Sequence, residues 1–368
     1  MHPPTLPRLK VPLGARRCVR PLARRLYRAE RPLRPWPALL LSSLLGATAC
    51  GPRAPAPLAP LDFTALTFNA GTTPGLDHDR GEATGEGDGY TQAMADIADA
   101  YYENSLSWNP AEAALTAFLA EKRPAIAAFQ EIFHDPWCEE IPAHPDLDFV
   151  CKDYTPDRPW QIQRLLGEGY TYLCAVGQPD NCAGVRTDFG TVRGCAPGTL
   201  CPEGLQGHPP PDGCSRGARM SKAVVDRADG RTLTLVVVHG TSGFSEEDMA
   251  CRRAQFEQVF VDAGDGRPLA DGEVNLILGD FNTDPIRMAG DPSADFVADH
   301  VGPGRRFHFV SPAGREAPAT YAGIATIDYL ISDRLEGSCI VPGVGEEPPV
   351  MDAIYWDHLP VLCQLRWR

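Results

Sequence analysis

The stretch LILGDFNTDP, residues 276–285, constrains the fold of this chain more than any other. The apolar run before Gly279 predicts a strand that is buried on both faces. Asp280 and Asn282 follow it, and the alternation of a strand would place both side chains on one side. Taken alone, such a motif usually marks an Asx turn that ends a strand. The carboxyl end of a buried strand is also where open α/β folds place their ligand-binding and catalytic residues, and a carboxylate and an amide lie there in this sequence.

Other apolar runs along the chain also predict strands, and each has a polar residue at or next to one of its ends. In chain order, these polar residues are Asn69, Gln130 with Glu131, His239, Asp328, and Asp357 with His358. Alternating strand and helix patterns between them favour an α/β fold. The patterns predict helices over 91–106, 111–122 and 245–263, a hairpin of 221–225 with 233–238, and a strand over 181–192.

In this order, Asn, Gln-Glu, His, Gly-Asp-Phe-Asn, Ile-Asp-Tyr and Asp-His-x-Pro-Val resemble the motifs of the endonuclease/exonuclease/phosphatase superfamily, the deoxyribonuclease I-like proteins. The resemblance covers about residues 62–368. It implies a four-layer α/β sandwich, in which two packed mixed β-sheets are flanked by helices. It also implies a metal-dependent hydrolase that acts on phosphate ester bonds.

The resemblance implies a divalent metal site made of Glu131, Asn69 and Asp357. Carboxylate and amide oxygens are hard ligands that suit Mg²⁺, Ca²⁺ or Mn²⁺. The plain alternative for Glu131 is an acid that caps a neighbouring helix.

The resemblance also assigns the catalytic roles. His358 would be the general base, and Asp328 would fix its tautomer. His239 would act as an acid or contact the phosphate. Asp280 and Asn282 would orient the attacking water and bind the phosphoryl oxygens.

The substrate is open at this level. Arg219 precedes His239 at a spacing that loosely matches a phosphate-contacting arginine, and a solvent-exposed arginine is an equally good interpretation. The candidates are a phosphodiesterase or endonuclease acting on nucleic acid, a sphingomyelinase-like phospholipid phosphodiesterase or an inositol-polyphosphate-type phosphatase, and a non-catalytic binding lipoprotein. The chain has 34 basic and 48 acidic residues and a net charge of −14. Residues 1–49 hold ten of the basic and one of the acidic residues, so the rest has 24 and 47, a net of −23, and repels phosphate backbones at long range.

The N-terminal region predicts export. Residues 1–49 hold a basic stretch and then an apolar segment that is too short to span a membrane and matches a secretory signal. Its GATAC ending resembles a bacterial lipoprotein signal, with Cys50 as the lipidated first mature residue. Residues 50–60 would form a Pro/Ala-rich tether, and residues 61–368 the phosphoesterase-like domain. We therefore expect an exported lipoprotein facing the periplasm or cell exterior, monomeric, and attached to the membrane only through its lipid.

The cysteines point to the same compartment. Ten of them follow Cys50, and seven of these lie within 134–217, which we interpret as a Cys-rich insertion. The spacing fits no structural zinc site. An even number behind an export signal predicts disulfides, whose pairing the sequence leaves undetermined.

Overall fold

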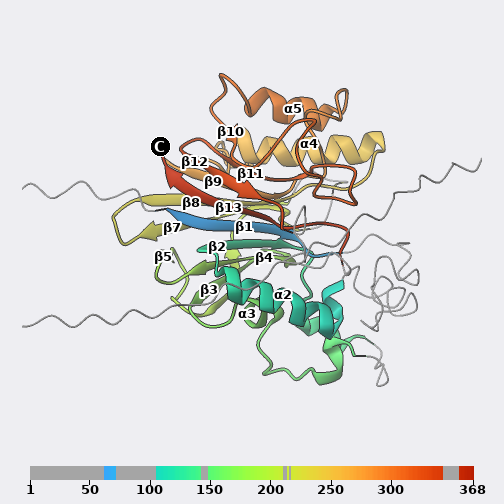
Figure 1. Ribbon diagram of the computed structural model, residues 1–368, viewed down its shortest axis with the longest axis vertical. Helices are drawn as coiled ribbons and strands as arrows, with labels where there is room; N and C mark the ends of the chain where they lie inside the picture. Colours follow the sequence, from blue (N-terminus) through green and yellow to red (C-terminus); the bar gives the residue numbers. More distant parts are fainter. Residues whose placement is uncertain (1–61, 72–104, 142–147, 210–213, 215–216, 343–355) are drawn as a thin grey trace, which may run out of the picture. The chain divides into compact units, whose positions relative to one another are not determined.

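The computed structural model describes residues 62–71, 105–141, 148–209, 214, 217–342 and 356–368 (Figure 1). The expected signal peptide, Cys50 and the tether lie outside these residues. So does the helix expected at 91–106, except for its last two residues, which fall in the short 3-10 helix η2 (Ser105–Ser107).

One mixed sheet has seven strands in the order β12-β13-β1-β2-β4-β3-β6. In chain order they are β1 (Phe63–Asn69), β2 (Ile126–Gln130), β3 (Tyr170–Ala175), β4 (Gln178–Arg186), β6 (Leu200–Leu205), β12 (Leu335–Ile340) and β13 (Val361–Trp367). β1 runs parallel to β2 and antiparallel to β13, so it lies inside the sheet with both edges paired.

The second mixed sheet has six strands in the order β10-β11-β9-β8-β7-β5. They are β5 (Gly190–Val192), β7 (Met220–Arg227), β8 (Thr232–His239), β9 (Asn275–Asp280), β10 (His308–Phe309) and β11 (Asp328–Ser332). β9 is the strand predicted from the apolar run before Gly279, and β7 with β8 is the predicted hairpin. β8 and β9 are parallel, so both end at the same edge.

Three apolar cores separate four layers. The inner faces of the two sheets share one core, which includes Ile126, Leu235 and Leu276. On the first sheet, the outer face packs against α2 (Asn109–Lys122) and α3 (Gln161–Leu166). The outer face of the second packs against α4 (Glu246–Phe260) and α5 (Pro292–His300), on the opposite side in Figure 1. This layering confirms the predicted α/β sandwich.

The N-terminus of α4 shows why the sequence starts a helix there. The Ser245 hydroxyl accepts a hydrogen bond from the Asp248 amide at 3.1 Å, and the Asp248 carboxylate accepts one from the Ser245 amide at 3.2 Å. This reciprocal capping satisfies two backbone N–H groups that a helix end leaves without partners. The predicted helix over 245–263 is confirmed, although it ends at Phe260.

The region 134–217 is more regular than a loop-rich insertion. Strands β3, β4 and β6 lie in it and make up one side of the seven-stranded sheet, and β5 joins the other sheet. The single strand expected over 181–192 is two strands, because β4 ends at Arg186 and β5 begins at Gly190. Pro, Gly and Cys interrupt these strands, which hides their alternation in the sequence.

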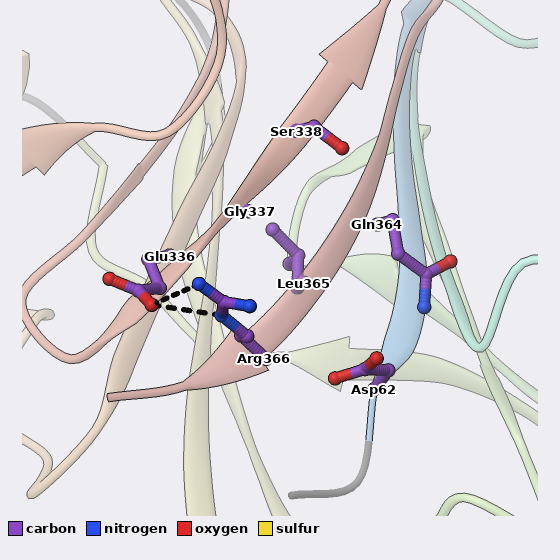
Figure 2. Close-up of a pocket in the computed structure, with 7 residues that line it drawn as sticks. All are labelled: Asp62, Glu336, Gly337, Ser338, Gln364, Leu365 and Arg366. Atoms are coloured by element: carbon purple, nitrogen blue, oxygen red, sulfur yellow. Dashed lines mark hydrogen bonds and ion pairs between the residues drawn. The ribbon is translucent and has the colours of Figure 1, made fainter.

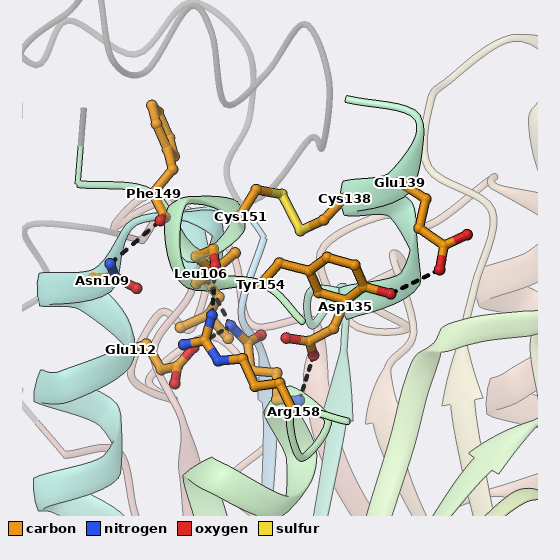
Figure 3. Close-up of a disulfide and its surroundings, with 12 residues drawn as sticks. Leu106, Asn109, Glu112, Asp135, Cys138, Glu139, Phe149, Cys151, Tyr154 and Arg158 are labelled. Atoms are coloured by element: carbon orange, nitrogen blue, oxygen red, sulfur yellow. Dashed lines mark hydrogen bonds between the residues drawn. A yellow bond between two sulfur atoms is a disulfide. The ribbon is translucent and has the colours of Figure 1, made fainter. Parts of the chain in front are cut away.

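The ten cysteines of the described residues form five disulfides, which confirms the predicted cross-linking. The pairs are Cys138–Cys151, Cys174–Cys182, Cys195–Cys201, Cys214–Cys251 and Cys339–Cys363. Figure 3 shows the first, which joins the 3-10 helices η3 (Asp135–Glu139) and η4 (Val150–Asp153). Five disulfides are typical of a protein outside the reducing cytoplasm. Within the described part of the chain, no helix is long and apolar enough to cross a membrane.

Candidate active site

The polar residues singled out in the sequence meet at one edge of the two sheets. In the six-stranded sheet, His239 ends β8, Asp280 ends β9 and Asp328 begins β11. Strand pairing places His239 beside Asp280, and Asp280 beside Asp328. Asn69 ends β1 of the other sheet, where it pairs with Gln130 at the end of β2.

Side-chain contacts join the two sheets at this edge. The Asn69 side-chain amide donates a hydrogen bond to Asp280 Oδ2 at 3.0 Å. His239 Nε2 lies 3.1 Å from Glu131 Oε1, and Glu131 follows directly after β2. The site therefore lies between the two sheets, and each sheet contributes part of it.

Asp280 and Asn282 are held together by a turn and not by strand alternation, so that part of the sequence interpretation is wrong. The strand ends at Asp280, and Asn282 has φ +49°. The Asn282 backbone amide donates to Asp280 Oδ1 at 2.7 Å, and its side-chain amide donates to Asp280 Oδ2 at 2.8 Å. The first of these bonds is an Asx turn, and it brings both polar groups into the site.

Gly279 lets the strand approach its neighbour closely enough to form this edge. Its φ is +150°, and a Cβ there would lie 1.9 Å from the Val238 carbonyl oxygen. Any other residue would push β9 away from β8.

His358 is hydrogen-bonded to Asp328, with 2.9 Å between Nδ1 and Oδ2. Its other nitrogen, Nε2, lies 3.9 Å from Asp280 Oδ2. The ring of Tyr321 lies 4.9 Å from the imidazole ring. His358 is therefore fixed on one side by a carboxylate, and its Nε2 faces the centre of the site.

The charges around His358 favour a proton. Burial by itself lowers the His358 pKa, but the carboxylates of Asp328 and Asp280 outweigh it and raise the pKa to about 10. For Asp280, a carboxylic acid, burial has the opposite effect and raises the pKa to about 6, and the charge of Asp328 adds to this rise. A cation bound beside Asp357 would oppose the proton and lower the His358 pKa.

Glu131 has the strained backbone that often marks a functional site. Its φ is +57°, which is unfavourable for a residue with a Cβ, and its side chain keeps 30% of its surface exposed. Desolvation raises the pKa of its carboxyl, and the negative charge of Asp357 raises it further. Gly71 lies against this carboxylate, because a Cβ there would be 1.7 Å from Glu131 Oε2.

The residues predicted to hold a metal fit a hard divalent cation. Asn69 is hydrogen-bonded to Glu131, and the like charges of Glu131 and Asp357 lie close enough to raise the Glu131 pKa. A cation removes such repulsion. The structure also groups Asp280, Asp328 and His358, whose ligand atoms lie within 4.8 Å of one another. The sequence interpretation gave these three only catalytic roles.

His239 has partners that the sequence did not suggest. Asn181, fully buried on β4, places its Oδ1 3.1 Å from His239 Nδ1. Burial and then the nearby charge of Arg219 lower the His239 pKa to about 3, so its imidazole is neutral. With Nδ1 against the Asn181 amide oxygen, the proton of the neutral ring lies on Nδ1.

Arg219 itself lies near the site. Its charge also opposes the rise in the Glu131 pKa, and its Nη1 lies 3.4 Å from the Gly240 carbonyl oxygen. Asn181 and Tyr321 were missed in the sequence because each lies in a segment with no strand-end signal of its own.

A surface pocket of about 350 Å³ lies elsewhere, along β12, β13 and the start of β1 (Figure 2). Asp62, at the start of β1, lines it, whereas Asn69 at the other end of the strand belongs to the site. The lining includes the ion pair of Arg366 with Glu336, at 2.8 Å. The pocket and the site therefore lie at opposite ends of β1, which is roughly 20 Å long.

The fold and the order of the site residues resemble those of the endonuclease/exonuclease/phosphatase superfamily. No known protein-family profile matches the chain, and no curated protein matches it significantly. Among solved structures, an endonuclease/exonuclease/phosphatase from Beutenbergia cavernae is 15% identical, with a TM-score of 0.47, over 83% of this chain and 72% of the other. ANGEL2, a 2′,3′-cyclic phosphatase, is 12% identical, with a TM-score of 0.48, over 84% and 97%. The catalytic domain of human Nocturnin is 13% identical, with a TM-score of 0.42, over 83% and 94%. At these identities and scores, the similarities bear on neither the activity nor the substrate of this chain.

Proposed function

We propose that this chain is a metal-dependent phosphoesterase, and specifically a phosphodiesterase or endonuclease that hydrolyses nucleic acid by attack of water. The observation that carries the proposal is the meeting of His358, hydrogen-bonded to Asp328, with Asp280 and Asn282 at one edge of the sheets. A base with an orienting carboxylate, beside groups that bind oxygen, is what phosphate ester hydrolysis requires.

In this proposal, His358 accepts the proton of the attacking water through Nε2, and Asp328 holds the ring through Nδ1. Asp280 orients the water. Arg219 donates hydrogen bonds to the phosphoryl oxygens as negative charge develops there, and Asn282 does so by exchanging one of its side-chain bonds to Gly240 and Asp280. His239 contacts the phosphate or acts as an acid once the negative charge of the substrate has raised its pKa.

Glu131, Asn69 and Asp357 would hold the divalent cation, Mg²⁺ or alternatively Ca²⁺ or Mn²⁺. When bound, the cation neutralises charge on a phosphoryl oxygen and so lowers the barrier to attack. Proton transfer, orientation of the water and contacts to the phosphoryl oxygens are carried out by the side chains named above.

The test uses the purified domain with plasmid DNA, sphingomyelin, an inositol polyphosphate and bis-p-nitrophenyl phosphate, each with Mg²⁺ and with EDTA. We expect hydrolysis of DNA and of the small diester in Mg²⁺ alone. His358→Ala and Asp328→Asn should each lower kcat by about 10²–10⁴-fold. The double variant should be little worse than His358→Ala, because residues that act as a unit lose their contribution together.

The other outcomes separate the alternatives. Hydrolysis of sphingomyelin or of the inositol phosphate, without hydrolysis of DNA, would assign the same site to a phospholipid head group or to a phosphatase. No metal-dependent hydrolysis of any of these substrates would favour a non-catalytic binding lipoprotein.

We further propose that residues 1–49 are a signal peptide, that Cys50 carries the lipid anchor, and that residues 50–60 connect it to a monomeric domain of residues 61–368. Metabolic labelling with a palmitate analogue should mark the wild type and spare Cys50→Ala. Equal labelling of both would exclude the anchor.

A further inference from the structure

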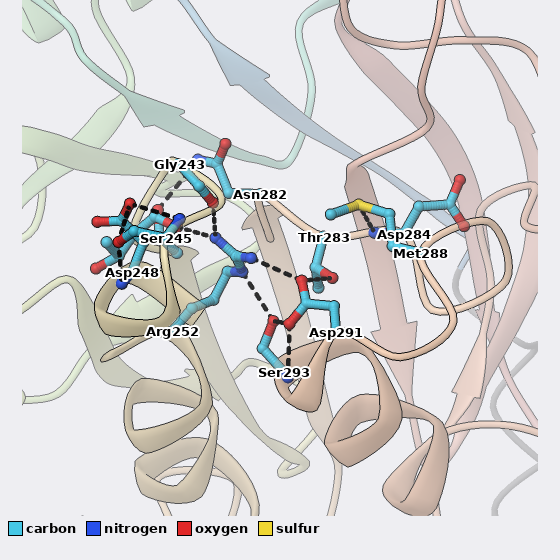
Figure 4. A network of polar contacts seen from close by, with 12 residues as sticks. Gly243, Ser245, Asp248, Arg252, Asn282, Thr283, Asp284, Met288, Asp291 and Ser293 are labelled. Carbon is cyan, nitrogen blue, oxygen red and sulfur yellow. Dashed lines mark hydrogen bonds and ion pairs between the residues drawn. The ribbon is translucent and has the colours of Figure 1, made fainter. Parts of the chain in front are cut away.

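A buried arginine behind the site has no part in the chemistry proposed above. Arg252, on α4, is 0% exposed and forms an ion pair with Asp291, with 2.7 Å between Nη2 and Oδ2 (Figure 4). Burying a guanidinium is costly unless its N–H groups find acceptors. The positions of these acceptors therefore show what Arg252 holds in place.

One set of acceptors lies in the loop that follows His239. Arg252 Nη1 donates to the carbonyl oxygens of Thr241 at 2.6 Å and Gly243 at 3.0 Å. Gln255, one turn along the same helix and fully buried, accepts a hydrogen bond from the Thr241 backbone amide at 2.8 Å. Both backbone polar groups of Thr241 are thus bound by α4.

The other set lies in the loop that follows Asn282. Arg252 Nε donates to the Ser293 hydroxyl at 2.8 Å, at the start of α5. The Asp291 carboxylate that binds Arg252 also accepts a hydrogen bond from the Thr283 hydroxyl at 3.3 Å. Thr283 is the residue next to Asn282, whose backbone has the left-handed φ of +49°.

The two loops touch between these anchors. The Asn282 side-chain amide donates to the Gly240 carbonyl oxygen at 3.0 Å. A Cβ at Gly240 would lie 2.4 Å from the Phe281 carbonyl oxygen, so the two backbones are in contact there. The separation of the loops thus sets where the Asn282 amide lies relative to His239.

We propose that Arg252 is a positioning residue that fixes the His239 loop against the Asn282 loop and so places the Asn282 amide for the phosphoryl group. This inference rests on the proposed function. The planar guanidinium is needed because its N–H groups form a rigid fork that reaches Asp291, Ser293 and Thr241 at once. A lysine in its place keeps the charge beside Asp291 but cannot hold both loops.

The experiment compares Arg252→Lys with Arg253→Lys, a matched control at the exposed neighbouring position on α4. With bis-p-nitrophenyl phosphate and Mg²⁺, we expect Arg252→Lys to lower kcat by about 10- to 100-fold with little change in KM, because small misplacements of a catalytic group have effects of this size. Arg253→Lys should match the wild type. A folded Arg252→Lys with wild-type kcat would overturn the proposal.

A second comparison asks whether Arg252 acts through Asn282. If it does, adding Arg252→Lys to Asn282→Ala should lower kcat by less than about 3-fold beyond Asn282→Ala alone. A general structural role would instead lower kcat by the same factor in both backgrounds. That result would overturn the positioning role.

Hydrogen exchange separates this inference from the proposed function. In Arg252→Lys, backbone amides of residues 239–243 and 281–286 should exchange faster than in Arg253→Lys, with the sheets unchanged. A wild type that hydrolyses no phosphoester would defeat the proposed function, whereas unchanged exchange in these loops would defeat the positioning role. If Arg252→Lys does not fold, Gln255→Met removes the acceptor for the Thr241 amide and should lower kcat by about 2- to 10-fold in the same direction. A folded Gln255→Met with wild-type kcat would then count against the proposal.

Discussion

Backbone strain at single residues gathers around the site. In the described residues, the non-glycine residues with positive φ are Arg123, Glu131, Asn282 and Ala322. Glu131 and Asn282 belong to the site, and Ala322 is hydrogen-bonded through its amide to the Asp357 carbonyl oxygen. Strain of this kind persists where the surrounding contacts hold it, and it is frequent at functional positions.

The strain at Glu131 predicts a trade of stability against activity. Glu131→Gly should raise the free energy of unfolding of the metal-free protein by about 1 kcal/mol, because glycine adopts φ +57° without a Cβ clash. Desolvation already disfavours the Glu131 charge, so its loss removes an unfavourable burial. Urea denaturation measures the gain, and hydrolysis of the small diester should be abolished.

Arg123→Gly is the matched control, since Arg123 ends α2 with φ +41° and lies outside the site. It should give a similar gain in stability with normal activity. A loss of stability in Glu131→Gly, with a gain in Arg123→Gly, would contradict strain at Glu131.

His134 predicts a dependence of stability on pH. Burial lowers the pKa of His134 to about 4, and its ring packs edge-on against Trp137 and Trp160. The unfolded chain, with a histidine pKa near 6.5, therefore binds more protons between about pH 6.5 and 4. The contribution of His134 to stability is fully present above this window and is lost as the pH falls through it, by on the order of 1–2 kcal/mol after allowance for solvent screening.

The measurement is the free energy of unfolding at about pH 7 and pH 5 for the wild type and His134→Phe. Phenylalanine keeps the aromatic contacts and cannot be protonated, so the variant should lose less stability at the lower pH. Equal losses in both proteins would show that His134 does not drive the change.

At the scale of the elements, the disulfides differ in what they connect. Cys214–Cys251 joins the segment before β7 to α4 across 37 residues, whereas Cys195–Cys201 closes a separation of only 6. The loss of chain entropy in the unfolded state grows with the size of the closed loop.

Replacing each of these two pairs by alanine should therefore have unequal effects. From chain entropy, loss of Cys214–Cys251 should lower the free energy of unfolding by about 4 kcal/mol, and loss of Cys195–Cys201 by about 2 kcal/mol. Urea denaturation of the two double variants gives the comparison. The reverse order would show that native contacts, and not chain entropy, decide the effect.

The elements also show what could be predicted from the sequence. The β9 strand, the β7–β8 hairpin, α2 and α4 follow from apolar periodicity and from the Ser245 cap, all of which are local signals. The polar residues at strand ends were found because a charged side chain interrupts an apolar run. The four strands between 170 and 205 were largely missed, since Pro, Gly and Cys obscure their alternation and since β5 and β6 pair with strands that are not their neighbours in the sequence.

Residues that act through other residues were not found. Asn181 and Arg252 look like ordinary polar positions of a strand and a helix, because their partners, His239 and the loops beside it, are distant or depend on packing. The Asx turn at Asp280 was considered in the sequence as the alternative to a site. In the structure the same turn builds the site.

For the molecule as a whole, the negative charge predicts an unusual response to salt. Without residues 1–49, which hold ten of the 34 basic and one of the 48 acidic residues, the protein has 24 basic and 47 acidic residues and a net charge of −23. It repels a polyanion, so screening should help DNA reach the site. Between about 20 and 150 mM NaCl, kcat/KM for DNA should rise, whereas DNA-binding proteins usually weaken with salt. For bis-p-nitrophenyl phosphate, which carries a single charge, kcat/KM should change little. A fall in kcat/KM for DNA over this range would indicate a local basic surface that outweighs the net charge.

The place of β13 has a consequence for how the protein is made. β13 lies between β12 and β1, and its pairing with β1 runs from Phe63 opposite Leu365 to Thr67 opposite Val361. On the ribosome, β1 is synthesised long before β13, so one edge of β1 has no partner until residues 361–367 emerge. His358 emerges only just before them. A nascent chain can therefore form the β1–β13 pairing and the proposed base His358 only at the end of synthesis. A chain that is truncated before residue 358 lacks both.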